Sequence, residues 1–480
     1  MPILQRDPAV LASFLEDAAH FPGGHADAIA SPTTEAEVAE VVRAAAAVLP
    51  IGAQSSLTGG ATPMGEVVLS TSRLNRVLDI GSDFVRVQAG VTLAELDTAL
   101  AAAGKYYPPA PTFTGAFVGG VVATNAAGAA TFKHGSTRDW VRAIRVVLAG
   151  GEAIEIVRGT RKAAELVPVP TYRLPRVPKC SAGYFAAPDM DLIDLFIGSE
   201  GTLGIVTEAT LRVVPQRPAL CLAFVVFDDR DRALAAVARL RDAAGAGVTA
   251  IEHMDARSLA LLREDRVDRH FGVTIAADAA IALLITFELE PAAAEAAADH
   301  VSAVLEAAGV TADVDVAMPH DRARAAQLLA VREAVPAAVN ARVGRAHQSI
   351  DARISKTAAD MIVPFDRLGA LMRLYDDEFA RRRLDAAVWG HISDGNLHPN
   401  VLPRSVADVE SGKEAILVFG REVMRMGGSP LAEHGVGRNP IKQQLLREMY
   451  GDDGIDEMRA VKRALDPAWK LAPGVLFPRA

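Results

Sequence analysis

Three glycine-rich segments constrain the fold of this 480-residue chain more than any other feature. The first, Gly52 to Gly60, follows a short apolar run that we expect to be a strand. It offers backbone N–H groups and hydroxyls with little side-chain bulk, which is what a pyrophosphate requires of a binding loop. The other two are Pro109 to Gly128 and Asp194 to Thr207. Any one of them alone could be a loop where two backbones pack closely, but three in one α/β region indicate a long cofactor.

Two other nucleotide-binding patterns find no support. No Gly-Lys-Ser/Thr follows the first glycine-rich segment, so it is not a Walker loop and nucleotide hydrolysis is not indicated. The segment Gly245 to Ala250 formally fits the dinucleotide fingerprint, but it follows a helical pattern, Arg232 to Ala244, instead of a strand. We interpret its glycines as the C-terminal stop of that helix.

The first part of the chain has the pattern of an α/β region. Apolar residues at helical spacing run from Glu35 to Val48 and follow a capping cluster at Ser31 to Thr34. Short apolar runs predict strands at Val67 to Ser70 and at Phe84 to Ala89. A second helix is predicted from Leu93 to Ala103, where a glycine ends it.

Composition and charge exclude several classes of protein. Half of the residues are hydrophobic, and the net charge of −9 comes without a basic cluster, which argues against nucleic acid as the main partner. Cys180 and Cys221 are too few for a disulfide framework and point to a reducing compartment. The N-terminus lacks a signal-peptide pattern, and the longest apolar run, Ala279 to Phe287, is too short to cross a bilayer. We expect a cytoplasmic protein, peripheral to the inner membrane if it works with a membrane chain.

Two polar clusters near the C-terminal end predict a metal site. His391 and His398 flank Asp394-Gly395, a strong tight-turn signal, so a hairpin could point both imidazoles at one place. Glu433, from a separate loop, would complete a set of two histidines and one carboxylate. That set suits Zn²⁺ or Mn²⁺ and leaves a position open for substrate. The alternative is that the histidines are surface residues beside a turn.

Together these segments resemble the flavin-binding signature of the vanillyl-alcohol oxidase / p-cresol methylhydroxylase superfamily. The motifs are Pro-x-Gly-x(6)-Gly-Gly ending at Gly60, Gly-Gly-x-x-Ala-Thr-Asn-Ala-x-Gly ending at Gly128, and Gly-Ser-Glu-Gly-Thr-Leu-Gly-Ile-Val-Thr ending at Thr207. Gly-His-x-x-Asp-Gly-Asn-Leu-His and Glu-His-Gly-Val-Gly narrow the resemblance. The chain is similar to the branch that contains D-lactate dehydrogenases, the glycolate oxidase catalytic subunit and D-2-hydroxyglutarate dehydrogenase.

The resemblance implies an α+β fold of three parts. A two-subdomain FAD-binding domain of the p-cresol methylhydroxylase type would cover residues 1–215. A ferredoxin-like α+β cap carrying the substrate site would cover 216–425, and a C-terminal segment, 426–480, would return to the FAD domain. The alternation expected of the cap is visible in strand-like Ala219 to Phe227 and Ile281 to Glu288 and in helix-like Arg232 to Ala244 and Pro291 to Ala308.

The resemblance also implies the cofactor contacts. FAD is expected to be dissociable, because the first glycine-rich segment has neither the histidine nor the tyrosine that could bind flavin covalently. His134, a nearby candidate, is interpreted as a structural loop residue. Ala472-Pro-Gly-Val475 stands where relatives often have Asn-Pro-Gly-Lys, which puts one polar contact in doubt. The expected contacts are Gly52, Ala53, Gln54, Ser55, Ser56, Gly59, Gly60, Pro111, Thr112, Gly119, Gly120, Thr124, Asn125, Gly128, Gly198, Glu200, Gly201, Gly204 and Ile205.

These residues assemble into an FAD-dependent dehydrogenase of a D-2-hydroxy acid. A metal on His391, His398 and Glu433 would acidify the substrate hydroxyl, His434 would take its proton, and hydride would pass to flavin N5. The resemblance implies that Arg332 pairs with the substrate carboxylate, with its neighbour Glu333 as an alternative salt-bridge partner. Lys356 and Asn396 are further candidates for substrate contact, although a turn-forming role would also explain Asn396.

Several alternatives stay open. Electrons would pass to an external acceptor, whether quinone, cytochrome or electron-transferring flavoprotein. The competing functions are an oxidase that uses O₂ directly, a metal-dependent hydrolase, an ether-lipid synthase of the superfamily and a non-catalytic binding module. The hydrolase leaves the three glycine-rich segments unexplained. Lactate, glycolate, malate and 2-hydroxyglutarate all remain candidate substrates, and a homodimer is compatible with the chain.

Overall fold

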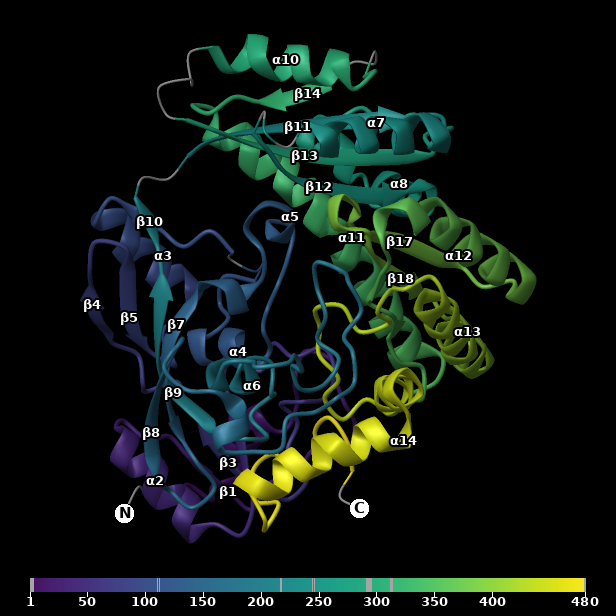
Figure 1. The fold of residues 1–480 in the computed structure, drawn as a ribbon. Helices are drawn as coiled ribbons and strands as arrows, with labels where there is room; N and C mark the ends of the chain where they lie inside the picture. The colour runs from purple at the N-terminus through teal and green to yellow at the C-terminus, as the bar shows by residue number, and fades with distance from the viewer. Residues whose placement is uncertain are drawn as a thin grey trace.

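The structure is a computed structural model, and it describes residues 4–109, 111, 113–215, 218–243, 245, 247–290, 296–310 and 314–478. Two α+β bodies lie side by side, and a C-terminal helix joins them (Figure 1). The N-terminal body contains sheets of two, three and five strands, and the second body is built on a long antiparallel sheet. Among the described residues, no helix is both long and apolar enough to cross a membrane.

The small N-terminal sheet is parallel, with strand order β1-β3-β2. Its strands are β1 (Ala28–Ala30), β3 (Val67–Ser70) and β2 (Val48–Ile51). Helix α2 (Glu35–Ala44) packs on it through buried valines, and the Thr34 side chain caps its first turn by accepting the N–H of Glu37. The helix was predicted to continue to Val48, which instead begins β2 because the chain turns extended at Ala45.

A five-stranded antiparallel sheet carries most of the flavin-type motifs. Its order is β4-β5-β9-β7-β8. Helix α4 (Val118–Ala123) starts against β5, where the N–H of Gly119 donates to the carbonyl of Ala89 at 2.7 Å. The third glycine-rich segment leads directly into β9. The strands are β4 (Val77–Ile80), β5 (Phe84–Gln88), β7 (Val141–Val147), β8 (Ala153–Val157) and β9 (Ile205–Arg212).

The remaining N-terminal elements are short, apart from α3. Helix α3 (Leu93–Ala102) begins with a capping box between Thr92 and Glu95, as its sequence favours. Strand β10 pairs with β6 just before the chain enters the second body. Other elements are α1 (Pro8–Leu11), β6 (Lys105–Tyr106), α5 (Thr131–His134), α6 (Leu192–Phe196) and β10 (Val214–Pro215).

The second body is an antiparallel sheet of order β14-β11-β13-β12-β17-β18-β15, with β16 also paired to β18. Its two faces bury separate apolar clusters, so the strands read as nearly continuous hydrophobic runs. The strands are β11 (Ala219–Phe227), β12 (Val248–Asp255), β13 (Ile281–Leu289), β14 (Val314–Ala317), β15 (Thr357–Ala358), β16 (Met361–Ile362), β17 (Ala386–His391) and β18 (Asn396–Val401).

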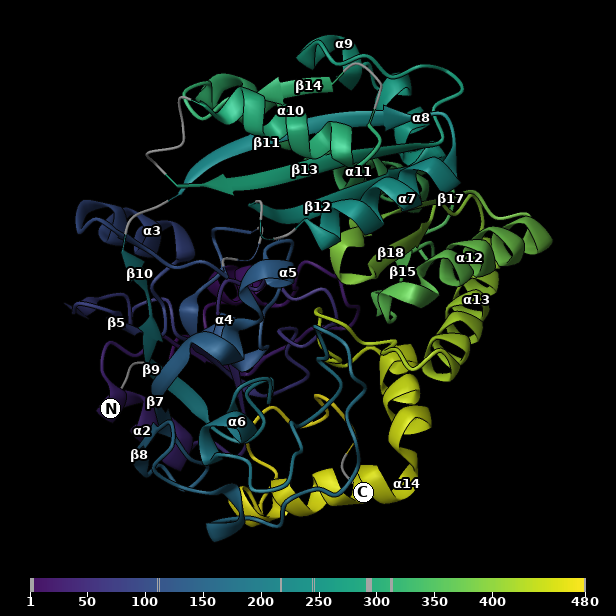
Figure 2. The same ribbon diagram turned by 45° about the horizontal axis from the view of Figure 1, so that its top comes forward.

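Helices cover both faces of this sheet (Figure 2). On one face pack α7 (Arg230–Asp242), α10 (Ala297–Ala307), α12 (Leu368–Arg382) and α13 (Val406–Arg425). On the other face pack α8 (Ala256–Glu264), α9 (Val267–Phe271) and α11 (Arg322–Ser349). The predicted strands and helices of the cap are present, and the fingerprint-like Gly245 does follow a helix. Of the predicted helix Pro291 to Ala308, residues 291–295 lie outside the described part.

Helix α14 (Pro440–Leu465) connects the two bodies (Figure 2). Leu445 near its start belongs to an apolar cluster of the second body, whereas Met458 and Val461 belong to the core of the first. The chain then returns to the small sheet, where Leu471 bridges Val48. The last part of the chain therefore packs on the first body.

Candidate active site

The hairpin of β17 and β18 places the two predicted histidines on one side of the large sheet. His391 is the last residue of β17 and pairs with Asn396, while His398 pairs with Trp389. The turn closes through Gly395, whose φ is 82° and where an added Cβ would lie 2.3 Å from the carbonyl oxygen of Val363. The imidazole rings of His391 and His398 consequently meet edge to face, with centroids 5.4 Å apart.

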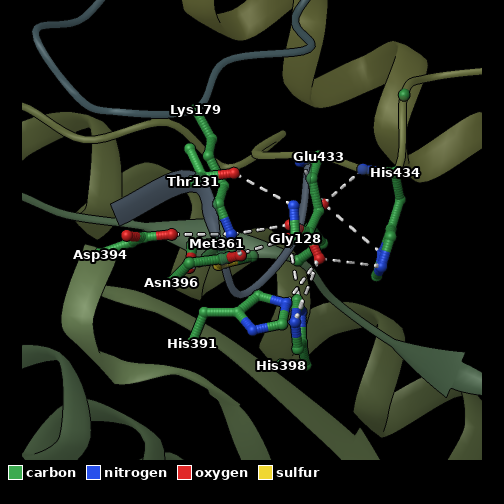
Figure 3. Close-up of polar contacts among 12 residues, drawn as sticks. Gly128, Thr131, Lys179, Met361, His391, Asp394, Asn396, His398, Glu433 and His434 are labelled. Carbon is green, nitrogen blue, oxygen red and sulfur yellow. Dashed lines mark hydrogen bonds and ion pairs between the residues drawn. The ribbon is translucent and has the colours of Figure 1, made fainter. Parts of the chain in front are cut away.

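A separate loop brings Glu433 to these imidazoles. Glu433 Oε1 lies 3.2 Å from His391 Nε2 and 3.5 Å from His398 Nε2. The loop is held by Asp360, whose Oδ2 accepts the backbone N–H groups of Glu433 and His434 at 2.7 and 2.8 Å. Figure 3 shows the side chains converging on Glu433. The structure therefore brings together all three residues predicted as metal ligands.

A set of possible ligands in the structure shares His398 and Glu433 with the predicted set, but has Asp360 and His434 in place of His391. One ligand atom each of Asp360, His398, Glu433 and His434 lies within 4.8 Å of the others. His391 makes its closest contact on the far side, where Nδ1 meets Glu252. That contact fixes the ring and leaves Nε2 facing Glu433. Imidazole and carboxylate donors at this separation suit a divalent ion such as Zn²⁺ or Mn²⁺.

The surroundings of His391 and His434 shift their pKa values in opposite directions. Burial lowers the pKa of His434 to about 4, so its imidazole is neutral near physiological pH and can accept a proton. Burial acts in the same direction on His391, but Glu252 overcomes it and raises the pKa of His391 to about 9. His434 stacks on His398 with ring centroids 5.1 Å apart. Its side chain is 28% exposed, against 6% for His398, so it is the imidazole that a substrate can reach.

Lys179 is a functional candidate that sequence reasoning missed. Its side chain is fully buried, and Nζ lies 2.9 Å from Glu433 Oε2 and 2.8 Å from Asp394 Oδ2. Among the described residues, neither oxygen of Asp394 has an aligned hydrogen-bond donor, so its contact with Lys179 is an ion pair without good hydrogen-bond geometry. Despite burial, the two carboxylates raise the pKa of Lys179. Lys179 follows a proline-rich stretch in the first body, and nothing local marks it as a partner of residues over 200 positions away.

The predicted substrate contacts lie at different distances from this cluster. Arg332 Nε lies 2.6 Å from Glu252 Oε2, which places it one side chain away from His391, and its Nη1 lies 3.3 Å from Glu333 Oε1. Asn396 is buried and donates to Asp360 Oδ1 at 2.9 Å. Lys356 is exposed, and no contact within the described residues joins it to the histidines.

A groove between the glycine-rich segments ends at Glu433 and His434. An added Cβ at Gly120 would meet no atom within 4 Å, so the chain there presents open space to the groove. Most predicted cofactor contacts line it: Gly52, Ala53, Gln54, Ser55, Ser56, Gly60, Pro111, Gly119, Gly120, Thr124, Glu200, Gly201, Gly204 and Ile205. Thr112 lies outside the described residues. The shape and lining fit a long ligand with a pyrophosphate.

Four predicted contacts do not line the groove, and each has another contact. Gly59 packs beneath the Phe21 ring, where an added Cβ would come within 2.6 Å. Gly128 donates its N–H to Thr131, and Asn125 accepts the N–H of Arg138 at 2.9 Å. At Gly198 an added Cβ would lie 3.3 Å from the Asn125 Cβ.

Glu200 joins the groove to the loop that carries Glu433 and His434. Its carboxylate accepts the N–H groups of Val436 and Gly437, both at 2.8 Å. Gly437 has a φ of 57°, and an added Cβ would lie 2.3 Å from Thr58 Oγ1 in the first glycine-rich segment. The loop that carries His434 therefore packs directly on the predicted pyrophosphate loop.

Comparison with known proteins gives matches over nearly the whole chain. Residues 26–156 match the family described as FAD binding domain, and residues 217–476 match FAD linked oxidases, C-terminal domain. A D-2-hydroxyglutarate dehydrogenase from Xanthomonas citri pv. viticola is 34% identical, covering 94% of this chain and 89% of that protein. Glycolate oxidase subunit GlcD from Bacillus subtilis is 28% identical with the same coverage, and a D-lactate dehydrogenase from Anaerostipes hadrus is 27% identical over 93% of this chain and 89% of that one.

Solved structures share the fold at much lower identity. A 4-ethylphenol oxidase from Gulosibacter chungangensis has a TM-score of 0.69 at 17% identity, over 99% of this chain and 94% of that chain. An alkyldihydroxyacetonephosphate synthase has the same TM-score and identity, over 99% of this chain and 82% of that one. At this identity the likeness concerns the fold alone.

Proposed function

Because the chain belongs to the FAD-linked oxidases of the vanillyl-alcohol oxidase / p-cresol methylhydroxylase superfamily, a family with D-2-hydroxyglutarate dehydrogenase, D-lactate dehydrogenase and glycolate oxidase among its members, we propose that it oxidises a D-2-hydroxy acid to the 2-oxo acid. The reaction would be assisted by a divalent metal, and the electrons would pass to an external acceptor. We further propose residues 1–215 as the flavin domain, 216–425 as the substrate domain and 426–480 as the returning segment.

The groove lined by the glycine-rich segments would hold FAD. When bound, FAD supplies the two-electron acceptor for the hydride lost from the substrate Cα. The residues around it orient the reaction: Gly119 and Gly120 permit close approach of the chain, and Glu200 holds the loop of His434 against the groove. No histidine or tyrosine occurs in the Gly52 to Gly60 segment, which supports dissociable binding.

His391, His398 and Glu433 would hold the metal, with Asp360 supporting them. A divalent ion there supplies Lewis-acid polarisation of the substrate hydroxyl. Asp360 hydrogen-bonds the backbone of Glu433 and lies 3.4 Å from His398 Nδ1, so it orients two of the three ligands. Lys179 neutralises the second oxygen of Glu433, and Glu252 orients His391.

His434 is proposed as the general base. A neutral imidazole that lines the end of the flavin groove can take the hydroxyl proton as hydride leaves Cα. Arg332 would pair with the substrate carboxylate, since its second terminal nitrogen makes no hydrogen bond within the described part of the chain. Lys356 and Asn396 would act at the edge of that site, Asn396 through Asp360.

The observation that carries this proposal is a neutral, partly exposed imidazole beside a buried histidine and carboxylate set at the end of the flavin groove. The test is anaerobic mixing of the holoenzyme with D- and L-forms of lactate, malate and 2-hydroxyglutarate, and with glycolate. Bleaching of the flavin band by a D-acid or glycolate, with one equivalent of 2-oxo acid formed, is expected. A flavin band that none of these acids bleaches would contradict the substrate class.

The same experiment repeated in air distinguishes a dehydrogenase from an oxidase. If the flavin stays reduced in air-saturated buffer until an acceptor is added, the enzyme is a dehydrogenase. Rapid reoxidation by O₂ with hydrogen peroxide formed would identify an oxidase of the same acid.

A further inference from the structure

A second cavity, of about 1010 Å³, lies on the other side of the wall of the flavin groove. The two hollows share the chain segment 124–127: Thr124 and Ala126 line the groove, while Asn125 lines the second cavity. Cys180 also lines it, and the residue before it, Lys179, contacts Glu433. A single layer of chain therefore separates this cavity from the groove and from the proposed metal ligands.

The outer wall of the cavity is the proline-rich stretch 168–178. Four prolines restrict its backbone, and two contacts anchor it to the rest of the molecule. The Thr171 N–H and hydroxyl both donate to the Glu457 carboxylate at 2.6 Å, and the Tyr172 hydroxyl donates to the Tyr184 carbonyl at 2.6 Å. These contacts fix the position of the wall, as a preformed ligand site requires.

Two unpartnered arginines of this wall, together with Lys162, outnumber the lining carboxylates of Asp139 and Asp189 and give the cavity a positive side. Arg173 and Arg176 line it, are exposed, and make no hydrogen bond or ion pair within the described residues. The other lining arginine, Arg138, is already engaged by the carbonyls of Asp194 and Ile197 and lies over the Phe185 ring. In a chain of net charge −9, two free guanidinium groups at one hollow create a local field that attracts anions.

Apolar and aromatic groups make up much of the remaining lining. Phe185, Leu174 and Met190 face the cavity together with Tyr172 and several of the prolines. A hollow with apolar walls and a cationic side selects a ligand that is flat and apolar in its body and anionic at one end. Its size is that of a small-molecule site and is too small to take in a protein domain.

We propose that this cavity binds an anionic aromatic electron acceptor and is where electrons leave the reduced flavin. The inference rests on the proposed function, because it requires a flavin that is reduced and then reoxidised. In the step, reduced FAD gives up two electrons and two protons and returns to the oxidised form. The quinoid ring of the acceptor takes up both and becomes hydroquinoid.

The experiment measures reoxidation alone, so that it does not depend on the substrate. Holoenzyme is reduced by stoichiometric dithionite and mixed anaerobically with dichlorophenolindophenol, an anionic quinone-imine dye, or with phenazine methosulfate, a cationic acceptor. The double variant Arg173→Glu/Arg176→Glu is compared with Arg269→Glu/Arg463→Glu. The latter residues are exposed, lie outside the cavity lining and give the same change in net charge.

We expect the cavity variant to slow reoxidation by the anionic dye about tenfold or more, as loss of electrostatic attraction predicts. Reoxidation by the cationic acceptor should not slow, the control variant should behave as wild type, and added salt should slow only the wild-type and control reactions with the anionic dye. Unchanged FAD content and circular dichroism would show that both variants fold.

Two results would overturn the proposal. One is an equal effect of the cavity and control variants on reoxidation, which would mean that the two arginines act only through the net charge of the protein. The other is slower reduction by the hydroxy acid with unchanged reoxidation, which would make the cavity an entrance for substrate. If no hydroxy acid reduces the flavin at all, the proposed function fails while the dithionite experiment still reads out the acceptor site.

Discussion

At the scale of the residue, Lys179 is the cation that balances the charge of two carboxylates in the candidate site. It is the buried cation between Glu433 and Asp394, both of which are also buried. Replacing it with methionine keeps most of the volume but leaves two carboxylates without their counter-charge. We expect Lys179→Met to lower the free energy of unfolding by about 3–5 kcal/mol.

Denaturant unfolding of the purified protein measures this effect. The control is Lys413→Met, whose ammonium pairs with Glu410 on the exposed surface of α13 and should cost under about 1 kcal/mol. Equal stability of the two variants would mean that Lys179 is not the counter-charge of this site.

The role of His434 as the base can be tested by substitution. Changing His434 to glutamine removes the proposed base while keeping a polar side chain. The rate of anaerobic flavin reduction by the hydroxy acid should fall by about 10²–10⁴ with FAD and metal contents unchanged. His320→Gln, at an exposed position, serves as the control. A variant that keeps the wild-type rate would exclude His434 as the base.

Residue type and spacing predicted much of this site, and long-range contacts account for what they missed. The Asp394-Gly395 turn signal predicted the hairpin, and the structure confirms it. Glu252 and Asp360 carry no motif, because each acts through a partner that only the folded sheet brings near. A buried ion pair that joins two parts of a chain leaves no periodic signal in the sequence.

At the scale of the element, helix α4 offers a matched pair of glycines. An added Cβ at Gly119 would lie 2.6 Å from the Ala89 Cβ, whereas at Gly120 it would meet nothing within 4 Å. Gly119→Ala should therefore destabilise the apoprotein by about 1–3 kcal/mol through overpacking against β5. Gly120→Ala should leave the apoprotein as stable or more stable by about 0.5–1 kcal/mol, because alanine favours the helix.

Gly120 should also affect the affinity for FAD. The Gly120 position lines the groove, so its alanine variant should bind FAD more weakly although its apoprotein is intact. Thermal unfolding of apoprotein and FAD titration measure the two effects separately. If Gly120→Ala binds FAD as tightly as wild type, the groove does not hold the cofactor at α4.

Strand β12 contains a histidine that should make stability depend on pH. His253 is fully buried, and neither ring nitrogen has a hydrogen-bond partner among the described residues. Burial, with a further contribution from Arg230, lowers its pKa from 6.5 to about 3. Between these values the unfolded state binds more protons, so stability is lost as pH falls through this window.

From pH 7 to pH 5 this single group should cost about 2 kcal/mol. We expect His253→Leu to flatten the dependence of the unfolding free energy on pH by that amount, and His320→Leu to leave it unchanged. Equal slopes for wild type and His253→Leu would show that the buried ring is not forced to stay neutral.

Predictions at this scale were strongest where local signals agreed. The capping cluster at Ser31 to Thr34 and the apolar runs of β11 and β13 were recognisable in the sequence. The end of α2 was overestimated, because alanines continue its helical pattern to the start of β2. The strand order of the large sheet could not be predicted, since β12 pairs with β17 across more than 130 residues.

At the scale of the whole molecule, the site exists only where the two bodies meet. Lys179 comes from the first body, the histidine hairpin from the sheet of the second, and the Glu433 loop from the segment that leads into α14. A further contact joins the bodies where Lys133 and His134 meet Glu288 of β13. Cofactor groove, proposed metal ligands and base are therefore positioned together by the docking of one body on the other.

We propose that the carboxylate and imidazole cluster assists a flavin reaction by holding a metal. Single-turnover reduction of bound FAD by the preferred D-acid, measured before and after metal removal at constant FAD content, tests this role of the metal. We expect reduction to slow about a hundredfold or more without metal and to recover when Zn²⁺ or Mn²⁺ is restored. Full-rate reduction by protein shown to be metal-free by elemental analysis would contradict it.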